Sequence, residues 1–380
     1  MKLFHISDLH IGKKVNGFSM IEDQRYILTE IIQMIEEERP DVLLISGDVY
    51  DVKQPSAEAV ALLDDFLKKL AKEHADTGMD TCIISGNHDS AERLAYASSI
   101  IDMSGIHISP VYDGKVSVFR KSDEYGEVYF YLLPFLRPAD VRRYFPDEDI
   151  NSYDDAIHTV VSDLNVDTSK RNVILSHQFV TGAKRSESEE VIVGGLDNIS
   201  ASNYDDFDYA ALGHIHGPQK TGRDTVRYSG TPLKYSFSED HDKKSVVEVD
   251  LLEKGNVSIS LHELTPKHDM RVIRGRYDDL MNRENYKDTD TDDYVKIVLT
   301  DEEDIPSAIE KLRVVYPNIM QLEYDNKRTR TAQTIEGDAK VGEKSPQQLF
   351  EEFYELQNNQ SMKDEQKEYV SSLIEKVWGD

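Results

Sequence analysis

Residues 41–51, DVLLISGDVYD, run from a continuous apolar stretch directly into a glycine and two aspartates. The apolar stretch does not alternate with polar residues, and such a run is typical of a parallel strand buried on both faces. The aspartates therefore follow the carboxyl end of a predicted buried strand. In α/β sheets this is the end at which sites form.

Four other apolar runs lead into polar residues of the same kind. The five predicted strands are Lys2–Ile6, Asp41–Ser46, Thr81–Ser85, Asn172–Leu175 and Tyr209–Leu212. They lead, in order, into Asp8-x-His10, Gly47-Asp48-x-x-Asp51, Gly86-Asn87-His88-Asp89, His177 and Gly213-His214-x-His216. One histidine at a strand end is ordinarily a hydrogen-bonding residue, but five such motifs together indicate a common site. Amphipathic helices predicted over Met20–Glu38 and Ala57–Ala71 separate the first three strands, so the predicted fold class is α/β.

The ligand types indicate a pair of metal ions. Imidazole, carboxylate and amide oxygens without thiolate suit Mn²⁺, iron or Zn²⁺, and there are too many ligands for one ion. The predicted ligands are Asp8, His10, Asp48 and His216 for the first ion, with Asp48 shared, and Asn87, His177 and His214 for the second. Two ions about 3.5–4 Å apart clamp the attacking and leaving oxygens of a phosphate ester. The motifs therefore predict a two-metal phosphoesterase.

Three further residues of the motifs are not needed as ligands. His88 directly follows a ligand and is expected to face the scissile phosphate, where it stabilises charge or protonates the leaving oxygen. Asp51 and Asp89 are expected to orient the histidine ligands.

The composition limits the class of protein. The chain of 380 residues carries a formal net charge of −28, which argues against a broad basic surface that wraps nucleic acid. Positive charge at the site would come from the ions. We find no signal peptide and no apolar run of about 18 residues, so no membrane segment is expected. The single cysteine, Cys82, excludes an intrachain disulfide and favours a cytoplasmic location.

The second half of the chain divides into smaller parts. Strands are predicted over Arg227–Ser229, Ser245–Leu251 and Ser258–Glu263, and then over Arg271–Tyr277, Tyr294–Leu299 and Asn318–Tyr324, with a helix over Asp304–Val315. The last four elements suffice for a small α+β unit. A polar stretch at 326–344 is predicted to be a linker. A helix pair at 345–380 has apolar faces, and the pattern alone leaves open whether it folds back or docks on a partner.

The order of the five motifs resembles that of the calcineurin-like metallophosphoesterases, and more narrowly the SbcD-type nuclease subunits of bacterial SbcCD complexes. The closer resemblance rests on the following stretches: GNHDSAERL (86–94), LLPFLRP (132–138), SHQFVTGAKRSESE (176–189), DYAALGHIHGPQ (208–219), YSGTPLKYSFSE (228–239) and SPQQLFEEFYELQNNQSMKDEQKEYV (345–370). It spans nearly the whole chain, with no departure at a ligand position.

The resemblance implies a metallophosphoesterase β-sandwich flanked by helices at 1–265, a DNA-recognition cap domain at 266–325, the linker, and C-terminal helices at 345–380 that bind an SbcC-like coiled-coil ATPase. It implies Mn²⁺ as the metal and a homodimer within a heterotetramer. It also implies ATP-dependent exonuclease action on double-strand ends and endonuclease action on single strands and hairpins, in DNA repair, recombination and replication. The candidate partner contacts are Leu349, Phe350, Phe353, Leu373 and Ile374.

The basic residues most plausibly near DNA are Arg93, Lys184, Arg185, Arg271, Arg274 and Arg276. Two alternatives to a nuclease remain at this point. A small-molecule phosphoesterase acting on cyclic nucleotides or nucleotides has the same metal core but little use for a cap and terminal helices. A scaffold with a decayed metal site would not keep every ligand and His88.

Overall fold

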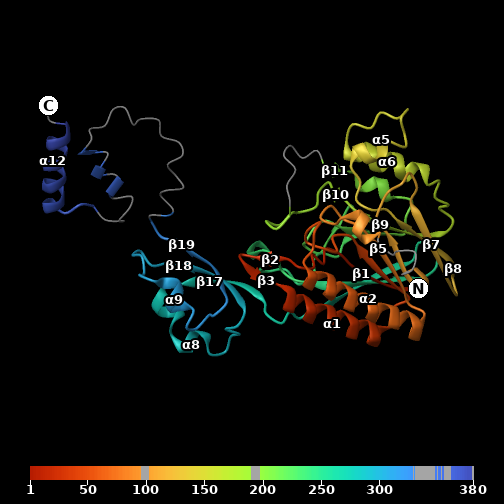
Figure 1. Ribbon diagram of the computed structural model, residues 1–380, viewed down its shortest axis with the longest axis horizontal. Helices are drawn as coiled ribbons and strands as arrows, with labels where there is room; N and C mark the ends of the chain where they lie inside the picture. The colour runs from red at the N-terminus through yellow and green to blue at the C-terminus, as the bar shows by residue number, and fades with distance from the viewer. Residues whose placement is uncertain are drawn as a thin grey trace. The chain divides into compact units, whose positions relative to one another are not determined.

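The computed structural model describes residues 1–95, 102–189, 197–327, 329, 347–348, 350–351, 353–354 and 361–378 (Figure 1). The chain forms two compact units, Met1–Asp269 and Met270–Asp380, each described by itself.

The first unit is built on two mixed sheets. Within the described residues, the first sheet has the order β16 (Val257–Glu263), β15 (Ser245–Leu251), β1 (Lys2–Ile6), β4 (Val42–Ser46), β5 (Asp80–Ile84) and β6 (Ile106–Ser109). The second has the order β13 (Gln219–Thr221), β14 (Arg223–Tyr228), β12 (Tyr209–Gly213), β9 (Arg171–His177), β8 (Gly126–Leu132) and β7 (Ser117–Asp123). The five predicted strands correspond to β1, β4 and β5 of one sheet and β9 and β12 of the other, and each pairs in parallel with a neighbour. The metal motifs are thus divided between two sheets.

The inner faces of the two sheets share one apolar core. Leu3 and Leu44 of the first sheet belong to the same buried cluster as Phe130, Val173 and Tyr209 of the second. The unit is therefore a β-sandwich, as the family resemblance implied. Its outer faces carry helices, so the central strands are buried on both sides and read as continuous apolar runs.

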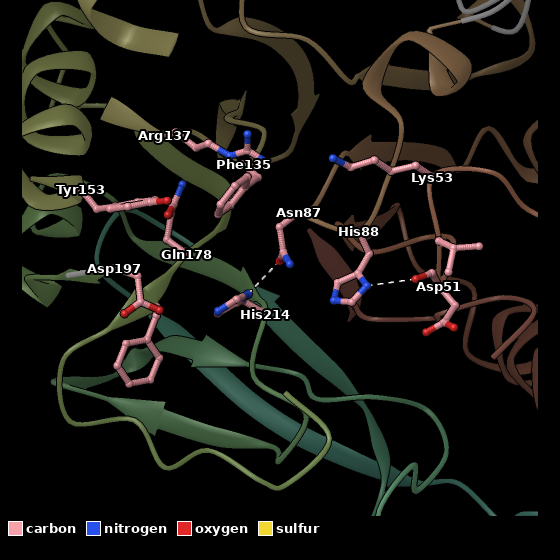
Figure 2. Close-up of a pocket in the computed structure, with 12 residues that line it drawn as sticks. Asp51, Lys53, Asn87, His88, Phe135, Arg137, Tyr153, Gln178, Asp197 and His214 are labelled. Carbon is pink, nitrogen blue, oxygen red and sulfur yellow. Dashed lines mark hydrogen bonds between the residues drawn. The ribbon is translucent and has the colours of Figure 1, made fainter. Parts of the chain in front are cut away.

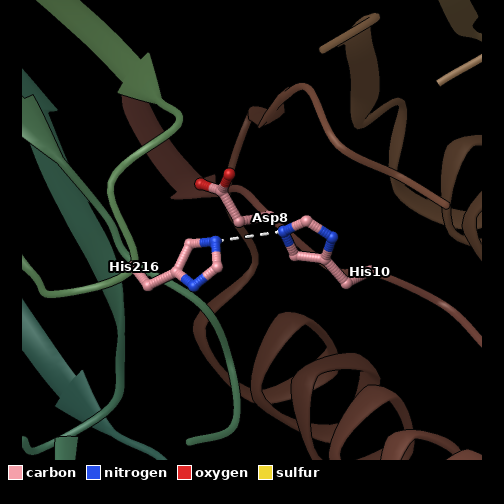
Figure 3. A group of neighbouring side chains, drawn as sticks. All are labelled: Asp8, His10 and His216. Atoms are coloured by element: carbon pink, nitrogen blue, oxygen red, sulfur yellow. Dashed lines mark hydrogen bonds between the residues drawn. The ribbon is translucent and has the colours of Figure 1, made fainter. Parts of the chain in front are cut away.

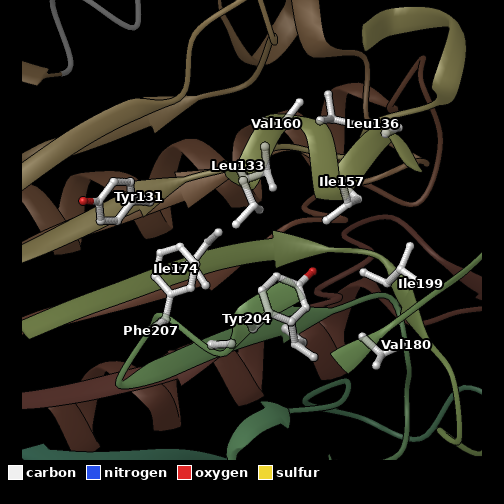
Figure 4. Close-up of a cluster of buried hydrophobic side chains, with 14 of the residues drawn as sticks. Tyr131, Leu133, Leu136, Ile157, Val160, Ile174, Val180, Ile199, Tyr204 and Phe207 are labelled. Atoms are coloured by element: carbon white, nitrogen blue, oxygen red, sulfur yellow. The ribbon is translucent and has the colours of Figure 1, made fainter. Parts of the chain in front are cut away.

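Helices line both outer sides of the sandwich. Figure 1 shows α1 (Ile21–Glu38) and α2 (Ala57–Thr77) side by side along one side of the unit, and α5 (Pro138–Arg142) and α6 (Tyr153–Asp163) on the other. The oxygen Oγ of Ser56 caps α2 by accepting the Ala59 N–H. Under α6, a cluster that includes Ile157, Ile174 and Tyr204 forms the second core (Figure 4).

The predictions missed the hairpin of β7 and β8 and the two helices α5 and α6. Strand β7 has exposed and half-buried positions only, so it lacks the apolar run that marks a buried strand. The shorter elements of the unit are β2 (Lys14–Val15), β3 (Phe18–Ser19), α3 (Ala91–Leu94), β10 (Phe179–Val180) and β11 (Asn198–Ile199). Short turns of 3₁₀-helix lie at Asp102–Ser104, Ala201–Tyr204 and Phe237–Glu239.

The second unit contains a three-stranded parallel sheet of β17 (Met270–Gly275), β18 (Tyr294–Leu299) and β19 (Ile319–Tyr324). Its helices are α7 (Tyr277–Leu280), α8 (Arg283–Tyr286), α9 (Ala308–Leu312) and α12 (Asp364–Trp378). The predicted strands are confirmed, whereas the helix predicted over Asp304–Val315 is only α9. Most of the predicted linker and of the first terminal helix lies outside the described residues. No helix in the described part of the chain has the length and apolarity to cross a membrane.

Candidate metal centre

The loops that follow β1 and β4 are tied together by their backbones. The N–H of Asp8 donates to the carbonyl of Gly47 at 3.0 Å, and the N–H of His10 donates to the carbonyl of Asp48 at 2.9 Å. Four predicted ligands have positive φ angles: Asp8 at 52°, His10 at 44°, Asp48 at 49° and His214 at 102°. Such conformations are strained in non-glycine residues and persist where the surrounding structure holds them, which is common at functional sites.

The glycines of the motifs allow the backbone to approach its neighbours closely. A Cβ on Gly86 would overlap the carboxylate of Asp48, and a Cβ on Gly213 would overlap the carbonyl of Ser46. Gly47 has a φ of +87°, a conformation that favours glycine. These positions bring strand ends from both sheets to one point.

The first group of side chains whose possible metal-ligand atoms face one another consists of Asp8, His10 and His216 (Figure 3). The Nε2 atoms of His10 and His216 are 3.1 Å apart. The other nitrogen of His216, Nδ1, lies 2.6 Å from Oγ of Ser188, and that of His10 lies 3.4 Å from a carboxylate oxygen of Asp51. Burial lowers the pKa of both histidines, so both are neutral at pH 7. Two lone pairs then face one point beside the carboxyl group of Asp8, an arrangement that fits a bound cation.

Asn87, His177 and His214 form the second group. The Oδ1 of Asn87 lies 3.1 Å from Nε2 of His177 and 3.0 Å from Nδ1 of His214. Because Nδ1 of His177 donates to the carbonyl of Ser46 at 2.8 Å, its Nε2 is the nitrogen that faces the site. Burial lowers the pKa of His214 to about 3, which keeps this imidazole neutral as well.

Asp48 lies between the two groups. Its Oδ2 is 3.3 Å from Nε2 of His177 and 3.7 Å from Nε2 of His10. Burial acts to raise the pKa of Asp48, but the charge and hydrogen bond of His177 outweigh it and hold that pKa well below its ordinary value. Asp48 is thus a carboxylate that lies near members of both groups. Asp8 of the first group also lies near His177, within the same set of facing ligand atoms.

Burial and neighbouring charges shift the pKa values of two predicted ligands in the centre, Asp8 and His177. Burial raises the pKa of Asp8 to about 8, and the negative charge of Asp48 adds to the rise. Burial opposes a charge on His177, but the Asp48 carboxylate raises its pKa to about 9. Divalent cations would remove this conflict, since they favour ionised carboxylates and neutral imidazoles.

His88 lies next to both groups. Its Nδ1 is 2.9 Å from the backbone carbonyl of Asp51, so Nδ1 carries the proton and Nε2 is left free (Figure 2). Its backbone N–H donates to Oδ1 of Asp48 at 2.9 Å, and its ring lies 4.9 Å from that of His10. Its side chain lines a pocket of about 340 Å³ beside Asn87 and His214.

The two supporting aspartates act differently from each other. A carboxylate oxygen of Asp51 lies 3.4 Å from Nδ1 of His10 and accepts a hydrogen bond from Lys13 at 2.8 Å. The expectation that Asp89 orients a histidine does not match its contacts. Its carboxylate accepts backbone N–H groups of Val49, Tyr50 and Gly86 at 3.1, 2.8 and 2.9 Å. Asp89 thereby fixes the loops that carry Asp48 and Asn87.

A buried hydrogen-bond network supports His216, and it was not predicted from the sequence. Oγ of Ser188 accepts from His216 and donates to Oε1 of Glu239 at 2.6 Å. Lys244 donates to Oε2 of Glu239 at 2.6 Å and to the carbonyl of His216 at 2.9 Å. The N–H of His216 donates to Glu189 at 2.6 Å. The stretches SESE (186–189) and YSFSE (235–239) stood out in the family resemblance, but neither was assigned a role.

The candidate DNA-contacting residues are dispersed. Arg93 and Lys184 are exposed on the first unit. Arg185 instead pairs with Asp197 and lies over the ring of Phe179 at 3.7 Å. Three arginines belong to the second unit and have acidic partners: Arg271 pairs with Asp293, Arg274 with Asp325, and Arg276 with Asp301.

The candidate partner-binding residues belong to the end of the chain. Phe350, Phe353 and Leu373 are exposed by 42%, 58% and 41%, and Ile374 is half-buried. Leu349 lies outside the described residues. Exposed large apolar side chains on a terminal segment are consistent with a docking surface.

Two family models match the chain: calcineurin-like phosphoesterase over residues 1–218, and the type 5 capsule protein repressor C-terminal domain over residues 266–358. The chain is 30% identical to the SbcD subunit of nuclease SbcCD from Staphylococcus epidermidis over 380 residues, which cover 98% of each chain. Among solved structures, a dimetal phosphatase from Danio rerio matches with a TM-score of 0.40 and 11% identity over 69% of this chain and 96% of the other. A protein of Thermus thermophilus matches with a TM-score of 0.38 and 9% identity over 68% and 98%.

Proposed function

The chain belongs to the calcineurin-like phosphoesterases and, within them, to the family of SbcD nuclease subunits; on this premise we propose that it cleaves the phosphodiester bonds of DNA at a centre of two divalent ions. It is a metal-dependent phosphodiesterase of the SbcCD nuclease type. The position of Asp48 between two groups of facing donors is the observation that carries the two-ion proposal.

The residues that would hold the ions are the predicted ones. Asp8, His10 and His216 would hold the first, Asn87, His177 and His214 the second, and Asp48 would bridge them. Bound there, the ions supply a hydroxide near neutral pH and neutralise phosphate oxygens. Their charge would also draw an anionic substrate to a chain whose net charge is −28. We propose Mn²⁺ as the metal.

His88 would act on the substrate itself. Since the carbonyl of Asp51 holds the proton on Nδ1, Nε2 faces the pocket and is available to a phosphate oxygen or to a leaving group. In its cationic form, with a proton on each ring nitrogen, His88 would stabilise charge on the phosphate and give the Nε2 proton to the departing oxygen. His88 is therefore proposed as a catalytic residue rather than a ligand.

The assembly follows from the family. We propose an SbcC-like coiled-coil ATPase as partner, bound by the helices at 345–380, and a homodimer of this chain within a heterotetramer. The proposed activities are ATP-dependent exonuclease action on double-strand ends and endonuclease action on hairpins and single strands, in DNA repair, recombination and replication. The proposed location of the protein is the cytoplasm. Residues 1–265 would form the nuclease domain, 266–325 a DNA-recognition cap and 326–344 a linker.

The test of the nuclease proposal compares substrates with one preparation of the full chain. We expect Mn²⁺-dependent cleavage of hairpin DNA and of bis-p-nitrophenyl phosphate, with little turnover of cyclic nucleotides. Fast turnover of cyclic nucleotides without DNA cleavage would instead support a small-molecule phosphoesterase. A chelator should abolish both expected activities.

The partner proposal is tested by co-expression with the ATPase. Phe353→Asp combined with Leu373→Asp should remove co-purification but spare hydrolysis of bis-p-nitrophenyl phosphate. Val314, which is 81% exposed in the second unit outside the terminal helices, offers a matched control as Val314→Asp. Unchanged co-purification of the double variant would refute the assignment.

A further inference from the structure

A pocket of about 340 Å³ lies directly beside the candidate metal centre (Figure 2). His88, Asn87 and His214 line one side of it, and Phe135, Tyr153 and Phe179 contribute aromatic rings elsewhere in its lining. This volume falls at the lower end of the range of about 300–1,000 Å³ that is usual for small-ligand sites. The pocket is thus large enough for a group that flanks a phosphate at the metals.

Phe135 is a half-buried ring held on a rigid segment. Its N–H donates to the carbonyl of Ser85 at 3.0 Å, and the side chain of Gln178 donates to the carbonyl of Leu136 at 3.1 Å. The ring lies 6.2 Å from that of the ligand His177, edge to face. Phe135 belongs to LLPFLRP (132–138), which had no assigned role. A fixed aromatic face beside the centre is suited to stacking with a planar group.

Two cations at this pocket form no ion pair in the described part of the chain. Lys53 and Arg137 both line the pocket and are exposed. Figure 2 shows Lys53 reaching toward the centre of the pocket and Arg137 beside the ring of Phe135, at 5.9 Å from its centroid. Other cations near the centre are neutralised: Lys13 pairs with Asp51 and Arg185 with Asp197.

We propose that this pocket binds one unpaired nucleotide of a single strand, with its base against Phe135 and a flanking phosphate held by Lys53 and Arg137. A stacking face combined with cations that follow the backbone is the arrangement by which proteins bind single strands without sequence preference. A paired base has its faces stacked in a duplex and does not enter such a pocket without leaving the helix. The inference rests on the proposed nuclease function and narrows its substrate to unpaired strands at this site.

The experiment uses the full chain with Mn²⁺ and two substrates of equal length, an oligothymidylate and an oligonucleotide of abasic tetrahydrofuran units. Both have the same phosphates, and only the first has bases. We expect the wild-type kcat/KM to be about tenfold higher on the oligothymidylate. Phe135→Ala and Phe135→Leu should each lower kcat/KM on the oligothymidylate about tenfold. The same variants should change kcat/KM on the abasic strand less than twofold. Phe135→Trp should keep the preference.

Lys53→Ala gives the complementary result. Because Lys53 would hold a phosphate, its loss should raise the KM of both substrates by the same factor, about three- to tenfold at low salt. Lys115, an exposed lysine outside this pocket, provides the matched control as Lys115→Ala. Metal titration by calorimetry should be the same for all variants and the wild type.

Equal wild-type cleavage of the two substrates, or an equal loss on both in Phe135→Ala, would overturn this inference and leave the nuclease proposal standing. Turnover of bis-p-nitrophenyl phosphate without cleavage of either strand would overturn both.

Discussion

The two halves of the metal centre differ in how they are enclosed. The closed half (Asp8, His10 and His216) is at most 3% exposed, whereas in the open half (Asn87, His177 and His214) two members are half-buried and line the pocket. The closed half is supported from behind by the network of Ser188, Glu239 and Lys244. We therefore expect the closed half to retain its ion more firmly and the open half to contact the substrate.

Replacing Asp48 should weaken metal binding in the closed half and in the open half alike, because Asp48 lies near both. We expect Asp48→Asn to weaken the binding of both ions and to reduce hydrolysis to background. Loss of a residue that only supports a ligand typically weakens metal binding by roughly 10–100-fold, and the loss of Asp48 should exceed this. Calorimetric titration with Mn²⁺ measures this directly. Two unchanged binding steps would show that Asp48 does not bridge.

His88 separates catalysis from metal binding. His88→Ala should lower kcat by about 10²–10⁴-fold while both ions still bind, since none of the predicted ligands is removed. The measurement pairs initial rates on hairpin DNA with metal content after gel filtration. Loss of an ion from this variant would mean that His88 is a ligand.

Ser188 tests the closed half alone. Ser188→Ala removes the acceptor for Nδ1 of His216 and should weaken one of the two ions by about 10–100-fold while the other binds as before. Ser188→Thr should restore the affinity because it keeps the hydroxyl. Ser169→Ala, at an exposed turn, serves as the control. An equal loss of both ions would contradict the division into halves.

The pH dependence of metal binding tests one predicted ligand in each half, Asp8 and His177. With raised pKa values of about 8 for Asp8 and about 9 for His177, both groups hold protons at pH 7 when no ion is bound. An ion must displace these protons, so the affinity for the ion should rise as the pH increases from 7 to 9. For each group that loses a proton, the affinity should rise about tenfold per pH unit until the pH reaches the pKa of that group. The heat of binding at pH 7 should vary with the ionisation enthalpy of the buffer. A heat independent of the buffer would exclude proton release.

The strands that carry the motifs could be predicted because burial on both faces produces apolar runs. The hairpin of β7 and β8 could not, since β7 is largely exposed and its residues alternate without a strong apolar pattern. The hydrogen bonds that Asp89 accepts from the backbone of Val49 and Tyr50 could not be predicted, because they depend on two loops that only folding brings together. The terminal helices showed their apolar faces in sequence, and α12 lies within the predicted pair.

The sequence by itself determined the chemistry of this protein: the kinds of ligand, their order along the chain, and hence a phosphoesterase with two metals. Only the tertiary structure decided which nitrogen of each histidine faces the site, because the choice depends on a hydrogen bond from the other nitrogen. For His177 that partner is the carbonyl of Ser46, and for His216 it is Ser188, neither of which is a neighbour in sequence. The pocket beside Asn87 is likewise formed by segments of both sheets, which meet only when the sandwich closes.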